Sequence, residues 1–536
     1  FSPTAPADRG TLARRVHYDL VGLPPTPEEL DAFLSDRSDS AYEALVDRLL
    51  ASPRFGEKWA RLWLDATRFA EDQAHIVGNN KSLFFPNAYL YRDWVINALN
   101  DDLPYDEFVR RQLAADLMPN IDDGEKVALG FMGLGPKYYR RNDPEVMADE
   151  WEDRVDTISR GLLGLTVACA RCHDHKYDAI ETEDYYALAG VFASTEMYNA
   201  PIGGGEKAKQ SKDEKSKAPK SAMHIVREGK PRNVKVQIRG NVKVLGDEVP
   251  RGFVRILSAE SQRQSFTQGS GRLELAAAIV HRDNPLAARV VVNRIWGQLF
   301  GRHLVGTPSN FGLLGQRPSH PELLDDLAVR FMDEGWSLKK LIREIVLSST
   351  YRQSSIASRE SLQRDPENRY LSRTNRRRLT VEGWRDGVLS VTGRISDEIG
   401  GASINVDDPD ETRRTIYSRV SRFELNPMLS MFDFPDPNIH ADRRVETITA
   451  LQRLFHLNSP FVAAHAEQLA QRVSKHESDL YGQVTLTYKL LFSRTPDDEE
   501  LALARDFLDV GDNERQQRWR EYAQLLLISN EMMYLD

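Results

Sequence analysis

The amino-acid sequence predicts a mainly α protein, built of two helical domains with a small β-hairpin or sheet insertion between them. Helix-start signals and apolar stripes of helical period occur in both halves of the chain, and one short run alternates apolar and polar residues as a strand does. The chain has 536 residues, too many for one ordinary hydrophobic core, so two or more domains that share an interface are expected. We place the helical domains at residues 1–200 and 268–536.

The first predicted domain, residues 1–200, begins with clear helix signals. Thr26-Pro27-Glu28-Glu29 has the pattern of a capping box with proline at the first helical position. Residues 40–52 carry one apolar stripe of period 3.6. Aromatic residues then follow at helical spacing and are expected in the core: Trp59, Trp63 and Phe69. The polar residues beside them belong either to a solvated face or to a site: Asp65, Arg68 and Glu71.

The segments between the two helical domains have a different composition. Residues 201–222 are rich in lysine and glycine, which predicts a flexible linker or loop. A small β segment is expected over 223–260. There Val234, Val236 and Ile238 alternate with polar residues, and Gly240-Asn241 predicts a tight turn before Val242 and Val244.

The second predicted domain, residues 268–536, returns to helical signals. Ser319-His320-Pro321-Glu322 predicts another capping box, which opens a helix that ends at Gly335. Thr495-Pro496-Asp497-Asp498 repeats the Thr-Pro helix start of residue 26.

Composition excludes several function classes. The formal net charge is -9, which disfavours a globally basic nucleic-acid binder. No apolar run reaches the roughly 18 to 20 residues that span a bilayer, so no transmembrane segment is expected. Signatures of serine hydrolases, phosphate loops, zinc proteases and dinucleotide-binding folds are absent from the sequence. The chain opens FSPTAPADRG, without a start Met or a signal-peptide core, so we expect a processed or trimmed chain.

The two cysteines of the chain stand together in Cys169-Ala170-Arg171-Cys172-His173. This Cys-x-x-Cys-His pattern is the covalent attachment signature of c-type haem, with His173 as the proximal iron ligand. The apolar spacing of residues 155, 158, 162 and 165 continues to both cysteines, which predicts that the thiols extend the apolar face of one helix. Haem c is therefore the expected cofactor, held by Cys169 and Cys172.

Three alternative roles of the cysteine pair remain open. The thiols could form a redox-active or structural disulfide, although the βαβ setting of such motifs is missing. They could bind zinc together with two of His173, His175 and other histidines. They could also be inert.

Several stretches resemble one protein family. GLLGLTVACARCHDHKYDAI, GEKWARLWLDATRFAED and the YRDWV segment resemble the first of two paired domains in large secreted proteins of planctomycetes and their relatives. NPLAARVVVNRIWGQLFGRHLVGTPSNFG, the stretch from RPSHPELLDD to STYRQSS, and DFPDPN resemble the second. One departure is Ala179, where the family usually has proline.

The resemblance covers nearly the whole chain and implies a fold and a haem, but not a reaction, because both domains are of unknown function. The family's name associates it with cytochrome c, and members often carry a further cytochrome c domain, which we expect to have been trimmed here. Members often occur in genomes rich in polysaccharide-degrading enzymes. The resemblance therefore hints at a carbohydrate substrate, and a polysaccharide or a small molecule is the candidate substrate.

The favoured function is an extracytoplasmic haem oxidoreductase, because the chain is far longer than a one-haem carrier needs and its extra surface could form a substrate cleft. The predicted catalytic residues are His175, Asp178, Arg294 and His320. Asp174, Tyr177, Asn293 and Arg317 are further candidates. Each of the four predicted catalytic residues also fits a structural role. His320 could form a local hydrogen bond and His175 could stabilise its turn. Arg294 could be a salt-bridge partner and Asp178 a helix cap.

Two other functions compete with this one. An electron-transfer module would carry a six-coordinate haem and exchange electrons with a partner cytochrome c domain. A structural or surface protein would carry a vestigial haem. A glycoside hydrolase is a less favoured alternative. Its catalytic carboxylate pair is defined by a distance in space and cannot be chosen from the sequence.

Two further expectations concern ions and location. Asp433, Asp436 and Asn438 in DFPDPN make a candidate calcium site, although they lack the twelve-residue calcium-loop pattern. Covalent haem attachment takes place outside the cytoplasm, so a periplasmic or otherwise extracytoplasmic, secreted location is expected.

Overall fold

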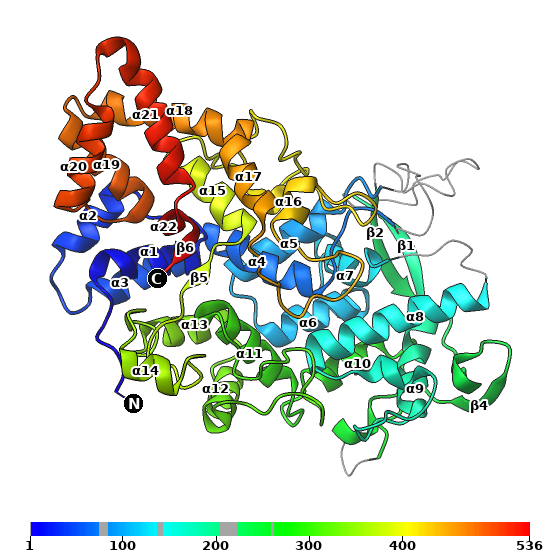
Figure 1. Cartoon of the computed structure of the whole chain (residues 1–536). Helices are drawn as coiled ribbons and strands as arrows, with labels where there is room; N and C mark the ends of the chain where they lie inside the picture. Colours follow the sequence, from blue (N-terminus) through cyan, green and yellow to red (C-terminus); the bar gives the residue numbers. More distant parts are fainter. Residues whose placement is uncertain (1, 74–83, 137–142, 203–221, 259–261) are drawn as a thin grey trace.

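A computed structural model describes residues 2–73, 84–136, 143–202, 222–258 and 262–536. The protein is mainly α, with three small two-stranded sheets among the described residues, which confirms the predicted fold class. The helices pack side by side and the β1–β2 sheet lies at one edge (Figure 1). The lysine-rich stretch falls almost wholly at 203–221, outside the described residues.

The first half of the chain is helical up to the first strand. Its α-helices are α1 (Arg9–Leu20), α2 (Pro27–Ser35), α3 (Ala41–Ala51), α4 (Arg54–Ala66), α5 (Tyr89–Asn100), α6 (Tyr105–Ala114), α7 (Gly130–Gly133), α8 (Pro144–Ile158) and α9 (Thr182–Ala193). Short helical turns lie among them: η3 (Ala115–Leu117), η4 (Asp123–Leu129), the π-turn η5 (Ser159–Leu163) and the 3₁₀ turn η6 (Val167–Arg171). The capping box at Thr26 is confirmed, because its hydroxyl accepts from the Glu29 amide and the Glu29 carboxylate accepts from the Thr26 amide.

The β segment forms two antiparallel pairs. Strand β1 (Thr195–Pro201) pairs with β2 (Ala222–Glu228), and β3 (Val234–Gln237) pairs with β4 (Leu245–Val249). The predicted hairpin is therefore present, but its second strand begins at Leu245 rather than at Val242. The turn η8 (Ile238–Gly240) and a register shift after Lys235 take up the residues that simple alternation assigns to the strands.

The second half returns to helix. Its α-helices are α10 (Arg272–Ile279), α11 (Ala287–Phe300), α12 (Pro321–Asp333), α13 (Leu338–Leu347), α14 (Arg359–Arg364), α15 (Val381–Val391), α16 (Pro427–Met431), α17 (Ala450–Asn458), α18 (Pro460–His476), α19 (Leu480–Phe492), α20 (Asp498–Leu508), α21 (Asp512–Leu527) and α22 (Asn530–Met533). The short elements are η9 (Arg255–Leu257), η11 (Thr415–Tyr417), β5 (Arg377–Arg378) and β6 (Tyr534–Leu535), with β5 and β6 paired.

Two helix starts in this half differ from the sequence expectation. The capping box predicted at Ser319 is wrong: His320 is the N-cap of α12, its side chain makes no capping bond, and Ser319 Oγ lies 2.9 Å from His320 Nδ1 instead. Helix α20 begins at Asp498, because Asp497 and Glu500 form the capping box there. Asp497 rather than Thr495 is thus the N-cap of this helix.

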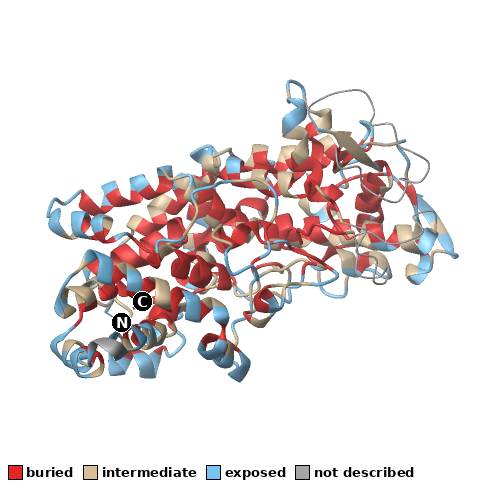
Figure 2. Ribbon diagram, turned by 90° about the horizontal axis from the view of Figure 1, so that it is seen from above, coloured by how far each residue is buried: buried red, intermediate tan, exposed pale blue. Residues whose placement is uncertain are grey.

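The hydrophobic core joins distant parts of the chain. One apolar cluster runs from Leu12 to Phe434 and includes buried residues of both predicted helical domains. A second cluster combines Tyr18 with residues from Leu379 to Leu535. Buried residues form a continuous band through the molecule (Figure 2). The two ends of the chain also meet, since the Arg14 guanidinium donates to the carbonyl oxygens of Glu531 and Tyr534.

Candidate functional site

The Cys-x-x-Cys-His segment lies on the surface, in what we call the CxxCH turn (residues 167–173). The prediction that both thiols extend the apolar face of one helix is wrong. The helix formed by α8 and η5 ends at Gly164, whose left-handed backbone (φ 60°) stops it. A Cβ at this position would lie 2.8 Å from the ring of Phe311, so close packing favours glycine there. The chain restarts as η6, which carries Cys169, and Cys172 follows directly.

Both thiols are free and exposed to solvent. In a 3₁₀ turn, residues three apart lie nearly one above the other, so Cys169 and Cys172 emerge on the same side of the turn. His173 is exposed beside them, and its Nδ1 lies 2.6 Å from the carbonyl oxygen of Asp174. In this contact Nδ1 is the donor, so in the neutral tautomer Nε2 is the nitrogen left to bind a metal. Two free, exposed thiols and an adjacent imidazole are a donor set that fits covalent haem.

Several contacts hold the CxxCH turn in place. The Tyr186 hydroxyl lies 2.9 Å from the carbonyl oxygen of Arg171 and 3.2 Å from that of Gln237, so it ties the turn to α9 and β3. The Arg171 guanidinium pairs with Asp149 and Glu152 on α8. At Gly240 (φ 72°), a Cβ would lie only 2.6 Å from Cys172 Sγ, so this backbone runs directly against the second thiol.

Exposed apolar side chains lie on segments next to the CxxCH turn. The β3–β4 turn, which contacts Cys172 through Gly240, also exposes Ile238, Val244 and Leu245. In the segment that follows the turn, Tyr177 is exposed, and Leu313, whose amide binds Asp178, is 78% exposed. An apolar macrocycle attached at the turn would find apolar neighbours there.

The predicted catalytic residues His175 and Asp178 hold the loop that follows. His175 Nδ1 accepts a hydrogen bond from the Asp178 amide (2.8 Å), and its Nε2 lies 3.0 Å from Thr166 Oγ1. The Asp178 carboxylate accepts from the Leu313 amide at 2.6 Å. Asp178 is not the cap of α9, because Glu181 and Asp184 form that capping box. Both residues therefore have structural partners, and their catalytic roles stay predictions.

The remaining candidates near the turn also have structural contacts. The Asp174 carboxylate accepts from the Thr182 amide, and Tyr177 lies under the Lys176 ammonium. Asn293 is buried and exchanges two hydrogen bonds with the backbone of Val305. His320, at the start of α12, contacts Ser319 and Tyr370. Arg317 is exposed.

Arg294 connects the CxxCH region to a second feature. Its side chain is buried and donates to the carbonyl oxygens of Arg160 and Gly161, in the π-turn that precedes the CxxCH turn. It also donates to Ser309 Oγ, which lies 2.6 Å from His440 Nε2. Burial and the nearby positive charge of Arg294 lower the pKa of His440 to about 3, so this imidazole is neutral. The other face of Arg294 lines a large cleft.

We call this cavity of about 800 Å³ the arginine-rich cleft. Its lining holds ten Lys or Arg and seven Asp or Glu side chains, a formal excess of three positive charges in a chain whose net charge is -9. The basic residues are Lys58, Arg61, Arg294, Arg302, Arg376, Arg377, Arg378, Arg414, Arg443 and Arg444. The acidic residues are Glu57, Asp65, Glu367, Glu382, Asp386, Asp442 and Glu446.

One wall of the cleft is a chain of ion pairs. Arg444 binds both oxygens of Glu382 at 2.7 Å and reaches Asp65 at 2.8 Å, and Arg61 pairs with the same Asp65. Burial would raise the pKa of Glu382, but the Arg444 guanidinium outweighs it and the pKa falls to about 2. Glu382 is therefore ionised at neutral pH, and its bidentate pair with Arg444 fixes this wall.

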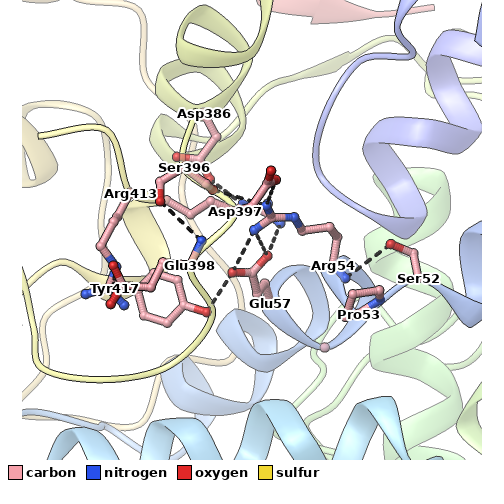
Figure 3. Close-up of polar contacts among 12 residues, drawn as sticks. Ser52, Pro53, Arg54, Glu57, Asp386, Ser396, Asp397, Glu398, Arg413 and Tyr417 are labelled. Carbon is pink, nitrogen blue, oxygen red and sulfur yellow. Dashed lines mark hydrogen bonds and ion pairs between the residues drawn. The ribbon is translucent and has the colours of Figure 1, made fainter. Parts of the chain in front are cut away.

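A second network forms the floor of the cleft. Glu57 is fully buried and accepts from Arg54 and the Tyr417 hydroxyl (Figure 3). It also accepts from Arg414. Arg414 also binds Asp386, whose other oxygen accepts from the backbone and hydroxyl of Thr415. The floor is therefore held together by buried charges that pair with one another.

Some cationic groups of the cleft have no acidic partner among the described residues. Arg294 binds carbonyl and hydroxyl oxygens, while Lys58 and Arg443 make no ion pair within the described chain. Burial lowers the pKa of Lys58 to about 8. Asp442 and Glu446 likewise lack an ion-pair partner in the residues described.

The residues that the structure describes hold no group of three or more His, Cys, Asp or Glu side chains arranged to bind a metal ion. The zinc alternative therefore gains no support from the geometry. In the candidate calcium segment, the Asp433 carboxylate binds the amide and hydroxyl of Thr447, and Asp436 binds Asn438. Calcium binding there stays an untested prediction.

The cleft was not predicted from the sequence, apart from Arg294. Its basic residues come from α4, α11 and the loop after it, the segment before α15, the residue before η11 and the segment 441–446. In sequence they look like ordinary surface charges. The one signal in the sequence is Asp65, a polar residue beside the aromatic stripe of α4.

Comparisons with known proteins agree with the resemblance. Residues 1–197 match the family model PSCyt2, described as a protein of unknown function (DUF1549), and residues 271–508 match PSD1, described as a protein of unknown function (DUF1553). No curated protein and no solved structure matches the chain. None of the described helices is both long and apolar enough to cross a membrane. The chain thus joins a region that matches the DUF1549 model to one that matches the DUF1553 model, the domain pair of the family that the sequence resembles.

Proposed function

We propose that the chain is an extracytoplasmic c-type haem oxidoreductase of the secreted, planctomycete-type members of this family. Haem would be attached covalently to Cys169 and Cys172, with His173 as the proximal ligand of the iron. The observation that carries the proposal is the CxxCH turn itself, in which two free, exposed thiols on one side are followed at once by an exposed imidazole.

The residues of the chain would then have distinct tasks. Cys169 and Cys172 anchor the macrocycle, and the Asp174 carbonyl oxygen orients His173 through Nδ1. When bound, haem supplies one-electron chemistry at its iron. The arginine-rich cleft is the candidate substrate site, because its volume of about 800 Å³ suits a small molecule or a few sugar units. A carbohydrate is the candidate substrate class.

The cleft and the CxxCH turn share structural elements, which supports a joint function. Arg294 lines the cleft and binds the π-turn that leads to the cysteines. The loop 306–316 also joins them: Gly306 and Gln316 line the cleft, while the Leu313 amide binds Asp178. A short packed connection therefore joins the two sites.

A second candidate function is electron transfer with a partner cytochrome c domain. It is favoured by the exposed apolar side chains around the CxxCH turn, because such a surface suits docking of another protein. In this case the haem iron would be six-coordinate, and the arginine-rich cleft would not be a substrate site.

An absorption spectrum of protein matured in a periplasm, oxidised and reduced, with and without carbon monoxide, separates these functions. A high-spin haem that binds carbon monoxide supports the oxidoreductase. A low-spin haem indifferent to carbon monoxide supports electron transfer. Absence of a Soret band, in a host that loads a control cytochrome c, would reject both.

A further inference from the structure

We propose that the arginine-rich cleft is a binding site for a small polyanion, a ligand with two or more carboxylate or sulfate groups, and that Lys58 and Arg443 contact separate acid groups of it. Binding itself does not depend on haem. Only the further step, that this polyanion is the substrate, rests on the proposed oxidoreductase.

The first support is the balance of charges in the cleft. Most acidic side chains of the cleft form ion pairs. Asp65 and Glu382 pair with Arg444, and Glu57 and Asp386 pair with Arg414. Arg377 and Arg376 pair with two acids that do not line the cleft, Asp19 and Asp536. Lys58 and Arg443 lack such partners among the described residues, so their charges are available to a ligand.

The second support is the position of these two cations. Lys58 lies near Arg377 and Arg414, with Asp19 and Glu382 as the acids that face it. Arg443 lies near His303, which Arg294 also faces. Burial and these two guanidinium groups lower the pKa of His303 to about 4, so the imidazole adds no charge of its own. The cleft thus has two separate cationic positions, which fits a ligand with two acid groups.

The third support is the nature of the remaining lining. Gln298, Gln316, Asn375 and Thr380 offer neutral hydrogen-bonding groups, whereas Asp442 and Glu446 restrict where an acid group can sit. Neutral polar groups in the same cleft as the two cationic positions suit the uncharged hydroxyl groups of an acidic saccharide.

Calorimetric titration of the full chain at low ionic strength tests the proposal. The probes are tetragalacturonate for carboxylates, a sulfated galactotetraose for sulfates, neutral galactotetraose, and inorganic sulfate. We expect one or both acidic tetrasaccharides to bind, more tightly than inorganic sulfate, with an affinity that falls as salt rises. Carboxylate-only or sulfate-only binding identifies the acid group. Equal binding of the neutral sugar, or no binding of any acidic probe, overturns the proposal.

Two variants and one control assign the contacts. Lys58→Met and Arg443→Met should each weaken binding about 10- to 100-fold, the usual effect of losing a charged hydrogen bond. Lys475→Gln, an exposed lysine of α18 outside the cleft, should leave binding unchanged. Retained affinity in both cleft variants would contradict the proposal. Arg443 is exposed, so its variant stays informative if Lys58→Met folds poorly.

The pH profile gives an independent readout. Lys58 is charged below about pH 8 in the free protein, so the affinity should fall as the pH rises above that value. A bound anion favours the charged amine and moves this midpoint upward. The Lys58→Met variant should lose this pH dependence.

The same titration in the Cys169→Ala/Cys172→Ala variant separates this inference from the haem proposal. Unchanged binding in that variant supports the cleft as an anion site whatever the fate of the haem. If this double variant folds normally but no longer binds the acidic tetrasaccharide, anion binding in the cleft depends on haem, and that part of the proposal is overturned.

Discussion

The CxxCH turn exposes its reactive side chains to solvent, whereas most charged side chains of the arginine-rich cleft are held in ion pairs. The turn is one continuous segment of seven residues. The cleft collects side chains from positions as far apart as Glu57 and Glu446. Local spacing can therefore reveal the first kind of site, and only folding assembles the second.

The largest expected effect concerns the turn. Cys169→Ala/Cys172→Ala should abolish covalent haem completely, because the turn then has no thiol to attach it. His173→Ala should change the spectrum, while the exposed His281→Ala should not. Pyridine haemochrome spectra and haem staining after denaturation measure the result. Haem that remains attached after denaturation in the double variant would refute attachment at this turn.

A large effect is also expected in the cleft wall. Arg444→Met leaves the largely buried carboxylates of Glu382 and Asp65 without their shared partner, and should lower the free energy of unfolding by about 3–5 kcal/mol. The neighbouring Arg443→Met is the matched control and should change it by less than about 0.5 kcal/mol, because Arg443 is exposed and has no ion pair in the described chain. Urea unfolding measures both. Equal effects would mean that the wall is not held by these pairs.

The free energy of unfolding should also depend on pH through the Arg444–Glu382 ion pair. The pKa of Glu382 is about 2 in the folded protein and 4.5 in its ordinary state. Its pairing therefore stabilises the protein above about pH 4.5, and this contribution of about 3 kcal/mol is lost as the pH falls towards 2. Urea midpoints of the wild type and Arg444→Met should converge on acidification. A difference that stays constant from neutral to acidic pH would argue against this ion pair as the cause.

The smallest expected effect tests the packing against Cys172. Gly240→Ala and Gly335→Ala both place alanine at positive φ, which costs about 1 kcal/mol. Only at Gly240 would the new Cβ meet a neighbour, Cys172 Sγ at 2.6 Å, so this variant should lose about 1 kcal/mol more. The extra loss should disappear in a Cys172→Ala background. Thermal unfolding measures it, and an extra loss that persists there would place its origin elsewhere.

Much of the fold could be predicted because the signals are local. The capping box at Thr26, the stripe of α3 and the alternation that begins β3 each depend on neighbouring residues, and each is present. The prediction of one helix through the cysteines failed because it continued a periodic pattern past Gly164. The left-handed backbone of Gly164 ends the helix there, and the ring of Phe311, far along the chain, leaves no room for a Cβ at this position.

For the sites, the sequence by itself determined the cysteine pair, the adjacent histidine and the mainly α architecture, since these depend on spacing within a few residues. Only the tertiary structure decided that the thiols face solvent, that His175 and Asp178 hold a loop, and that ten basic side chains meet in one cleft. The physical reason is that the pairing of charges depends on distance in space. Arg444 and Asp65 are far apart in the chain but 2.8 Å apart in the fold.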